Sequence, residues 1–440
     1  MWFSKIMKFY FIFGFIFSGF LSSQQIYIPV GKAKSNRETL VLEKTIGTSK
    51  AAQIFNQSLA DDFAFGDFFQ LSRNNLSSSS ASLEVSRESI QAYKSKGAFY
   101  LLKSAVVHEG ASLHAEIRLV DVRKGVLLLS RKYPYSGTNF QSAYAELAHV
   151  AADDVVEKIT GEKSVFRTRL LMSCGRKNKE IYMMNFNGKG LKQLTFDGNF
   201  ALSPSWGPRG NKIIFTSYLP SKKGGFVNPN LYSFDVQTKK RSLVTASPGM
   251  NSGAVYHPTK NLIAYTYSNK GNPEIFLLNP GAKKRTPVTK SHFFSIEPDW
   301  SPDGEQLVFS SSKSGKPHIY IAQASGRSQR QLTFAGYYNS SPSWSPKGDQ
   351  IVFAGQDTRS GNFNLFSIAP NGSNLERLTK GSASKESPSV SPDGRFVAYS
   401  SNEGGVYRVR VLALQTGKIT EPLSSASLGH CKQPAWSPQY

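Results

Sequence analysis

The stretch SPSWSPKGDQIVFAG, residues 341–355, decides the fold of this 440-residue chain. A Trp precedes a Ser-Pro-x-Gly turn, and a run of β-branched and aromatic residues follows that turn. Pro presets φ for a turn and Gly takes a positive φ, whereas Ile, Val and Phe favour a half-buried strand. The stretch therefore predicts two antiparallel strands joined by a tight turn.

The same pattern returns along the second part of the chain at nearly even spacing. We call the positions equivalent to Trp344 the Trp column; successive members are 50, 44, 44, 46 and 46 residues apart. The last copy of the pattern, QPAWSP, ends at residue 438. A period in this range with several strands per repeat indicates a β-propeller. The column consists of Trp206, Tyr256, Trp300, Trp344, Val390 and Trp436.

Each repeat has two further apolar segments, the second ending in Leu-Thr or Val-Thr, so that a repeat supplies four strands. The last repeat stops at Tyr440, just after its first strand. Residues 169–195 supply a second, third and fourth strand without a first. The two ends therefore combine into one composite blade, which closes a six-bladed propeller at residues 169–440. Closure hides strand edges that an open ring would expose.

Both cysteines belong to this composite blade. Cys431 lies five residues before Trp436, and Cys174 stands where Ser217 and Ser311 stand in other repeats. The hairpin register sets the two positions opposite each other, at a Cα separation of about 4.5–5.5 Å. This separation permits a disulfide, and an exported protein retains one. We expect a Cys174–Cys431 disulfide; two free core thiols are the alternative.

Residues 1–23 have the pattern of a secretory signal peptide, with Lys5 and Lys8 before a Phe-rich apolar run and small serines at the end. The mature chain is expected to begin near Gln24 and to reside in the periplasm. An uncleaved membrane anchor is the alternative, although the apolar run is short for a spanning helix.

Residues 24–160 lack the repeat and predict an α+β domain, and residues 161–168 are expected to link it to the propeller. Apolar residues at helical spacing predict helices over residues 49–63 and 140–159. Three strand-like runs joined by Gly-containing turns predict an antiparallel meander; they are residues 99–107, 113–120 and 126–133.

The net charge of +23 is concentrated in the propeller. Residues 24–160 hold 16 Lys and Arg against 14 Asp and Glu, whereas residues 161–440 hold 35 against 16. Such a surface attracts acidic partners: an acidic protein, anionic lipid or a wall polymer. Export argues against nucleic acid. A basic surface that is merely solvated is the alternative.

Catalytic motifs are absent from the sequence. It contains no Gly-x-Ser-x-Gly elbow, His-Glu-x-x-His motif, phosphate loop or Rossmann fingerprint, and its seven His residues are scattered. We therefore expect no enzymatic activity, no cofactor and no metal site. Convergence of several His on the channel mouth to bind a metal is the alternative.

The segment AADDVVEKITGEKSVFRTR, residues 151–169, closely resembles the segment that joins the two domains in the TolB family. This family consists of periplasmic propeller proteins of the Tol–Pal system. The terminal PAWSP, the number of repeats and the split closure are also similar. The resemblance implies a monomeric, non-enzymatic adaptor with a peripheral place in the envelope. Such adaptors bind the peptidoglycan-associated lipoprotein Pal and the inner-membrane protein TolA, and support outer-membrane integrity and constriction at division.

The resemblance also implies binding residues. Pal would contact loops that lead into the first strands of the propeller blades, although the residues directly before Asn251 and Glu297 differ from the family's usual His and Thr. The candidate residues are Asn251, Gly253, Glu297 and Pro298.

For a TolA-like partner the matching segment is residues 24–31, where the alternation of Ile26, Ile28 and Val30 suits addition to a partner's sheet edge. Alternatively, a protein other than TolA binds this segment. For the whole chain, the alternatives are a propeller that binds peptidoglycan or lipopolysaccharide directly, or a propeller lyase or glycosidase.

Overall fold

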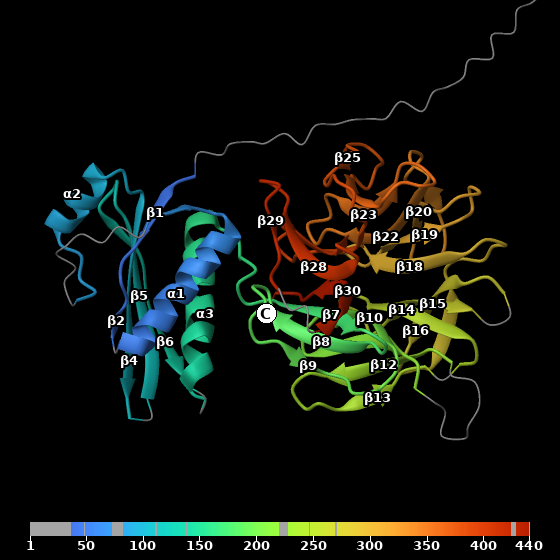
Figure 1. Cartoon of the computed structure of the whole chain (residues 1–440), viewed down its shortest axis with the longest axis horizontal. Coiled ribbons are helices and arrows are strands. Elements are labelled where there is room, and N and C mark those ends of the chain that lie inside the picture. The colour runs from blue at the N-terminus through green and yellow to red at the C-terminus, as the bar shows by residue number, and fades with distance from the viewer. Residues whose placement is uncertain are drawn as a thin grey trace, which may run out of the picture.

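The computed structural model describes residues 37–47, 49–72, 82–110, 112–137, 140–219, 228–245, 247–268, 271–423 and 428–439. The expected signal peptide and Ile26, Ile28 and Val30 lie outside these residues. The chain forms an N-terminal part of helices and one sheet, followed by a propeller (Figure 1). Among the described residues, no helix has the length and apolar character needed to cross a membrane.

The N-terminal part is built on a mixed sheet with the order β3-β1-β4-β5-β6, and β2 also pairs with β4. The predicted antiparallel meander is confirmed, because β5 pairs antiparallel with both β4 and β6. The sequence did not predict β1, which pairs parallel with both β3 and β4. The strands are β1 (Thr39–Leu42), β2 (Ile46–Gly47), β3 (Gln70–Ser72), β4 (Tyr100–Glu109), β5 (Ser112–Asp121) and β6 (Val126–Tyr135).

Two long helices, α1 (Ser49–Gly66) and α3 (Phe140–Thr160), pack against one face of this sheet, and the short α2 (Arg87–Ser95) packs against the other. Phe55, Leu59 and Phe63 of α1 lie four residues apart and are fully buried. This helical spacing puts them on one face, and each buried side chain stabilises the fold by about 1.5–3 kcal/mol.

The propeller consists of six antiparallel sheets of four strands, which confirms the predicted fold. Blade I contains β10 (Ala201–Trp206), β11 (Lys212–Ser217), β12 (Asn230–Asp235) and β13 (Arg241–Leu243). Blade II contains β14 (Met250–Tyr256), β15 (Ile263–Ser268), β16 (Glu274–Asn279) and β17 (Lys284–Pro287). Blade III contains β18 (Ser295–Trp300), β19 (Gln306–Ser311), β20 (His318–Gln323) and β21 (Arg330–Gln331).

The remaining blades follow the same plan. Blade IV contains β22 (Tyr338–Trp344), β23 (Ile351–Gln356), β24 (Asn364–Ile368) and β25 (Glu376–Arg377). Blade V contains β26 (Lys385–Val390), β27 (Phe396–Glu403), β28 (Val406–Ala413) and β29 (Ile419–Thr420). Blade VI is the composite blade, with β30 (His430–Trp436) beside β7 (Arg169–Gly175), β8 (Glu180–Asn185) and β9 (Lys192–Gln193).

In blade VI, β30 runs antiparallel to β7 and sets Cys431 directly opposite Cys174. The structure joins the two residues by a disulfide, with a Cα–Cα distance of 4.1 Å, across 257 residues of sequence. The register inferred from the other repeats is thus the register of the composite hairpin.

The two parts of the chain share one hydrophobic core, to which the expected linker, residues 161–168, contributes Val165 and Phe166. Val165 and Phe166 are buried, and the indole Nε1 of Trp436 donates to Thr168 Oγ1 at 2.8 Å. The expected linker is therefore a packed segment. Phe186, at the end of β8, completes the junction against aromatic rings of α1.

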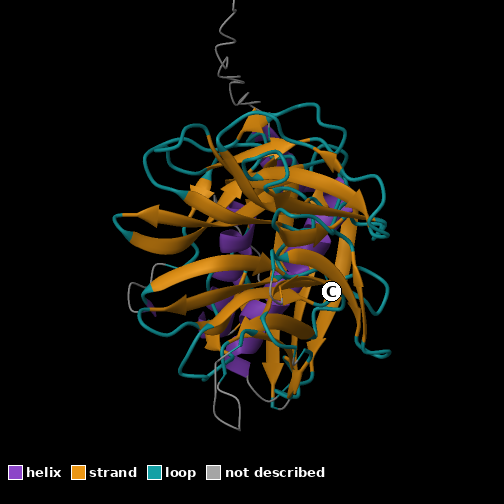
Figure 2. Ribbon diagram, turned by 90° about the vertical axis from the view of Figure 1, so that its right-hand side faces the viewer, coloured by secondary structure: helices purple, strands orange, loops and turns teal. Residues whose placement is uncertain are grey.

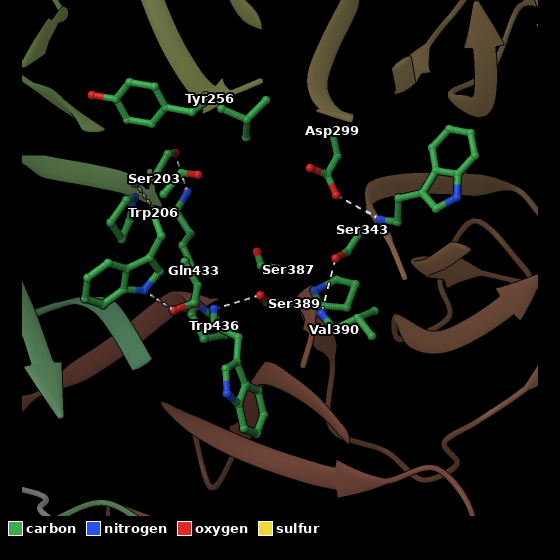
Figure 3. Close-up of a pocket in the computed structure, with 18 of the residues that line it drawn as sticks. Ser203, Trp206, Tyr256, Asp299, Ser343, Ser387, Ser389, Val390, Gln433 and Trp436 are labelled. Atoms are coloured by element: carbon green, nitrogen blue, oxygen red, sulfur yellow. Dashed lines mark hydrogen bonds between the residues drawn. The ribbon is translucent and has the colours of Figure 1, made fainter. Parts of the chain in front are cut away.

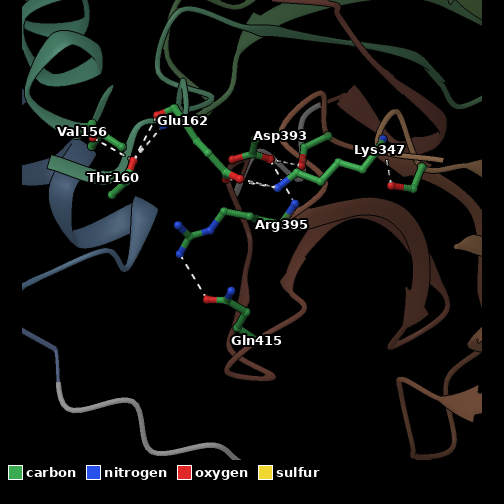
Figure 4. Close-up of polar contacts among 9 residues, drawn as sticks. Val156, Thr160, Glu162, Lys347, Asp393, Arg395 and Gln415 are labelled. Carbon is green, nitrogen blue, oxygen red and sulfur yellow. Dashed lines mark hydrogen bonds and ion pairs between the residues drawn. The ribbon is translucent and has the colours of Figure 1, made fainter. Parts of the chain in front are cut away.

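Polar contacts surround this junction (Figure 4). Lys347 Nζ lies 3.0 Å from the carboxylate of Glu162, and the Arg395 guanidinium lies 3.7 Å from the centre of the Phe68 ring. Lys418 Nζ donates to the carbonyl oxygen of Ala64 at 3.0 Å. Since the propeller residues come from turns between first and second or third and fourth strands, we call this side of the propeller the domain face.

Candidate functional site: the propeller mouth

The opposite side of the propeller, here called the mouth face, carries two sets of loops. One set joins the second strand of a blade to its third, and the other joins the fourth strand to the first strand of the next blade. Figure 2 views the molecule from the propeller side, with the helices of the N-terminal part behind the strands. The mouth face therefore points away from the N-terminal part.

A cavity of about 460 Å³ lies on the propeller axis and is lined by the first strands of all six blades (Figure 3). Three of the six blades contribute a Ser-Pro-Ser segment to its wall. Five blades place a Pro at the same position, and the weak repeat of blade II places Ala254 there. The five residues are Pro204, Pro298, Pro342, Pro388 and Pro434.

Each first strand contains a bulge, which follows from the shift in register against its second strand. One residue of every bulge has a positive φ, between 49° and 58°, although only one of the six is a Gly. Bulges of this kind redirect a side chain away from the pleat, here toward the axis. The six residues are Ser203, Gly253, Glu297, Ser341, Ser387 and Gln433.

The Glu297 side chain projects from the bulge of blade III and forms hydrogen bonds with blade IV. Its Oε2 accepts hydrogen bonds from the Ser341 backbone N–H at 2.7 Å and from Ser310 Oγ at 3.0 Å. Its Oε1 accepts a hydrogen bond from Ser341 Oγ at 2.9 Å. The carboxylate is therefore fully engaged inside the propeller, where it holds the strained backbone of the next bulge.

Gln433 does the same between blades VI and I. Its Oε1 accepts from the Ser203 backbone N–H at 2.8 Å, and its Nε2 donates to Ser203 Oγ at 3.1 Å. Hydrogen bonds equivalent to those of Glu297 thus join the composite blade VI to blade I. These two pairs fix the cavity wall at two places on the ring.

A second set of bonds between blades lies two residues further along the first strands. Asp299 Oδ2 accepts from the Trp344 backbone N–H at 2.8 Å, and Ser389 Oγ accepts from the Trp436 backbone N–H at 2.9 Å. Removal from bulk solvent raises the pKa of Asp299 to about 6, and hydrogen bonds from the backbone N–H groups of Trp344 and Trp300 oppose this rise.

The predicted site residues occupy two different places. Gly253, Glu297 and Pro298 line the axial cavity. Asn251 does not, because it is fully buried at the start of β14. Its Nδ2 donates to the carbonyl oxygens of Pro229, Ser247 and Gly249 at 3.0–3.3 Å, so that it shapes the loop that enters the blade.

The sequence analysis missed Gln433, Asp299 and Ser341, although they carry bonds across the cavity wall. A usable signal existed, because Gln433 and Ser341 stand at the same repeat position as Glu297. The polar side chains of the wall are mainly Ser, with Glu297, Asp299 and Gln433. Among the described residues of the whole chain, no cluster of His, Cys, Asp and Glu could hold a metal ion.

Fold and site together define a six-bladed propeller protein with an α/β N-terminal part and an axial cavity lined by the first strands of all six blades. The model of the TolB β-propeller domain matches residues 156–440. The chain therefore belongs to the TolB propeller family.

Individual relatives agree with this assignment. The Tol-Pal system protein TolB of Desulfosudis oleivorans is 33% identical over 262 residues, covering 58% of this chain and 54% of that protein. A TolB homolog of Chlorobium chlorochromatii is 34% identical over 252 residues, with 56% and 54% covered. The chain thus spans about half the length of these curated relatives. The crystal structure of TolB from Acinetobacter baumannii shares the fold, with a TM-score of 0.80 at 22% identity, over 94% of this chain and 100% of that one.

Proposed function

We propose that this protein is a non-enzymatic adaptor of the Tol–Pal envelope system, which works in the periplasm in outer-membrane integrity and in constriction at division. The observation that carries the proposal is the match of residues 156–440 to the TolB propeller, combined with an axial cavity lined by the first strands of all six blades. The relative from Desulfosudis oleivorans is a Tol-Pal system protein, and the carboxylate of Glu297 in the cavity wall is used to hold the next blade.

The first partner in this proposal is a Pal-like lipoprotein bound at the mouth face. The excess of basic residues in the propeller favours an acidic partner. Glu297 and Asn251 support this contact indirectly, because both side chains hold backbone in place rather than project toward a partner. Pro298 and Gly253 line the axial cavity, so that this proposal places the partner's contact close to them.

The second partner is a TolA-like inner-membrane protein, bound by the segment with Ile26, Ile28 and Val30. This segment precedes β1 in the chain and lies outside the described residues. The two partners would therefore bind through different segments of the chain, and one adaptor could hold both together.

Calorimetric titration of the mature chain with the periplasmic domain of a Pal-like lipoprotein tests the first contact. Glu297→Ala frees the bulge at Ser341 and should weaken binding by about 1–2 kcal/mol, since a partly buried acceptor for three donors is lost. Glu305→Ala is the matched control, because Glu305 is an exposed carboxylate in a domain-face turn of the same blade. Equal affinities for the two variants and the wild type would place the site elsewhere.

Deletion of residues 24–31 separates the two contacts. The shortened chain should keep its affinity for the lipoprotein domain and lose binding to the periplasmic domain of a TolA-like protein. Sedimentation with purified sacculi, in the absence of lipoprotein, tests the alternative of direct wall binding. Release of glycan fragments from sacculi would instead indicate a lyase or glycosidase.

A further inference from the structure

The mouth face carries exposed Phe side chains on its loops. Among the described residues, the exposed large hydrophobic side chains include four Phe, and all four lie on loops that join a fourth strand to the next first strand. They belong to three of the six junctions between blades. The four residues are Phe196, Phe200, Phe293 and Phe334.

Phe196 and Phe334 are held in solvent by rigid backbone. Each follows a buried Thr at the end of a blade, and their side chains are 76% and 78% exposed. Thr195 Oγ1 accepts a hydrogen bond from the Ile181 N–H at 2.9 Å, and Thr333 Oγ1 accepts the equivalent bond from Ile319 at 3.0 Å. Because the preceding residue is anchored in this way, the two rings cannot fold back into the core without breaking the end of the blade.

Two other blades place a Lys at this same repeat position. Lys290 and Lys380 are exposed, and each follows a Thr whose Oγ1 is bonded to the third strand of its blade. Equivalent positions in a propeller lie at the same height above the mouth. The rim therefore carries, at one level, two Phe rings and two Lys side chains, in the order Phe196, Lys290, Phe334, Lys380.

These side chains surround the cavity. Phe196 lies at the junction of blades VI and I, and Phe334 at the junction of blades III and IV, which is the opposite side of a six-membered ring. Phe293 lies between them, at the junction of blades II and III. The exposed rings are thus spread over three junctions around the propeller axis.

The charge of this face is positive. Among the described residues of this face, the exposed acidic ones are Asp357 and Glu403, which form ion pairs with propeller arginines at 2.9 Å and 2.6 Å. The exposed basic residues on the described loops of this face are Arg176, Lys177, Lys290, Lys313, Lys316, Arg359 and Lys380. A negatively charged surface is thus the complement of the mouth face.

We propose that the mouth face docks on an anionic phospholipid bilayer. The Phe rings enter the boundary between headgroups and acyl chains, and the Lys side chains contact lipid phosphates. Apolar side chains combined with Lys on one flat face are the pattern of peripheral membrane binding. A protein hot spot instead centres on a packed pocket rich in Trp, Tyr and Arg. This inference goes beyond the proposed function, because it concerns the rim rather than the cavity.

Co-sedimentation of the mature chain with vesicles tests the apolar contribution. The vesicles contain phosphatidylglycerol mixed with phosphatidylcholine, and pure phosphatidylcholine vesicles serve as the neutral reference. Phe196→Ser and Phe334→Ser should each lower the partition coefficient about tenfold, from the loss of an inserted ring. Leu127→Ser is the matched control, because Leu127 is 52% exposed on the N-terminal part and should leave binding unchanged.

A second set of variants tests the charge. Lys290→Gln and Lys380→Gln should each weaken binding to the anionic vesicles about fivefold, and added salt should weaken wild-type binding. Lys96→Gln, an exposed Lys on the N-terminal part, is the control. Failure of the wild type to bind anionic vesicles, or equal binding by the Phe variants, would overturn the proposal. Phe variants that lose affinity only for the lipoprotein domain would assign the rim to a protein partner and overturn it as well.

Discussion

Replacing Phe186 by Ala should uncouple the unfolding of the two parts of the chain. The Phe186 ring is fully buried, and its centre lies 4.9 Å from that of Phe65 on α1 and 5.5 Å from that of Phe166. The His149 ring of α3 lies 5.5 Å away on another side. One propeller side chain thus contacts both long helices of the N-terminal part.

The expected loss follows from this packing. Truncation of a fully buried Phe costs about 3–5 kcal/mol, from lost burial and from the cavity left behind. In this variant the loss falls on the contact between the two parts. Phe353→Ala is the matched control, because Phe353 is 2% exposed and stacks on Phe366 inside blade IV. It should cost a similar free energy without touching the junction.

Scanning calorimetry distinguishes the two variants. The wild type should unfold in one transition, since a single core joins its parts. Phe186→Ala should split this transition into two. Phe353→Ala should keep a single transition and lower its midpoint temperature. Two separate transitions in the wild type, or a single transition in Phe186→Ala, would refute the idea that this ring couples the two parts.

Two further predictions concern groups away from the mouth. The double variant Cys174→Ala/Cys431→Ala should lower the free energy of unfolding by at most about 5–6 kcal/mol, since the disulfide closes a loop of 257 residues. Unfolding in urea measures this loss. Two free thiols in the unreduced, denatured wild type would show that the disulfide does not form. Burial raises the pKa of Asp62 from 3.8 to about 6, although the ion pair with His149 opposes this rise. The folded protein therefore holds this proton more tightly than the unfolded chain does. The free energy of unfolding should consequently fall by up to about 3 kcal/mol as the pH rises from about 4 to about 6. Asp62→Asn should remove this pH dependence of the free energy of unfolding, whereas Asp61→Asn should retain it. Equal profiles of unfolding free energy against pH for the wild type and Asp62→Asn would contradict the prediction.

The propeller could be predicted from the sequence because its information is local and repeated. A Trp, a Ser-Pro-x-Gly turn and a strand recur at each blade, so that every copy supports the register of the others. The same register placed Cys174 opposite Cys431, although the two residues are 257 positions apart. In the N-terminal part, helices and the meander were recognisable by periodicity for the same local reason.

Other features depend on contacts that no local pattern contains. β1 is four residues long, too short for a period, and its parallel partners are distant in sequence. Glu297 reads as a surface carboxylate in the sequence. Its structural role depends on a positive φ and on the backbone of Ser341, 44 residues away. Residues 161–168 are polar enough to read as a linker, and only the fold reveals that Val165 and Phe166 are buried.

The composite blade also determines when the protein can finish folding. β7 is made early, yet its partner β30 is made only after blades I to V have been synthesised. Until then the nascent chain has an open ring with an unpaired strand edge, which exposes it to aggregation and to proteases. A chain cut short before β30 would lack Trp436, Gln433 and Cys431 together. Ring closure thus acts as a check that only molecules synthesised through β30 pass.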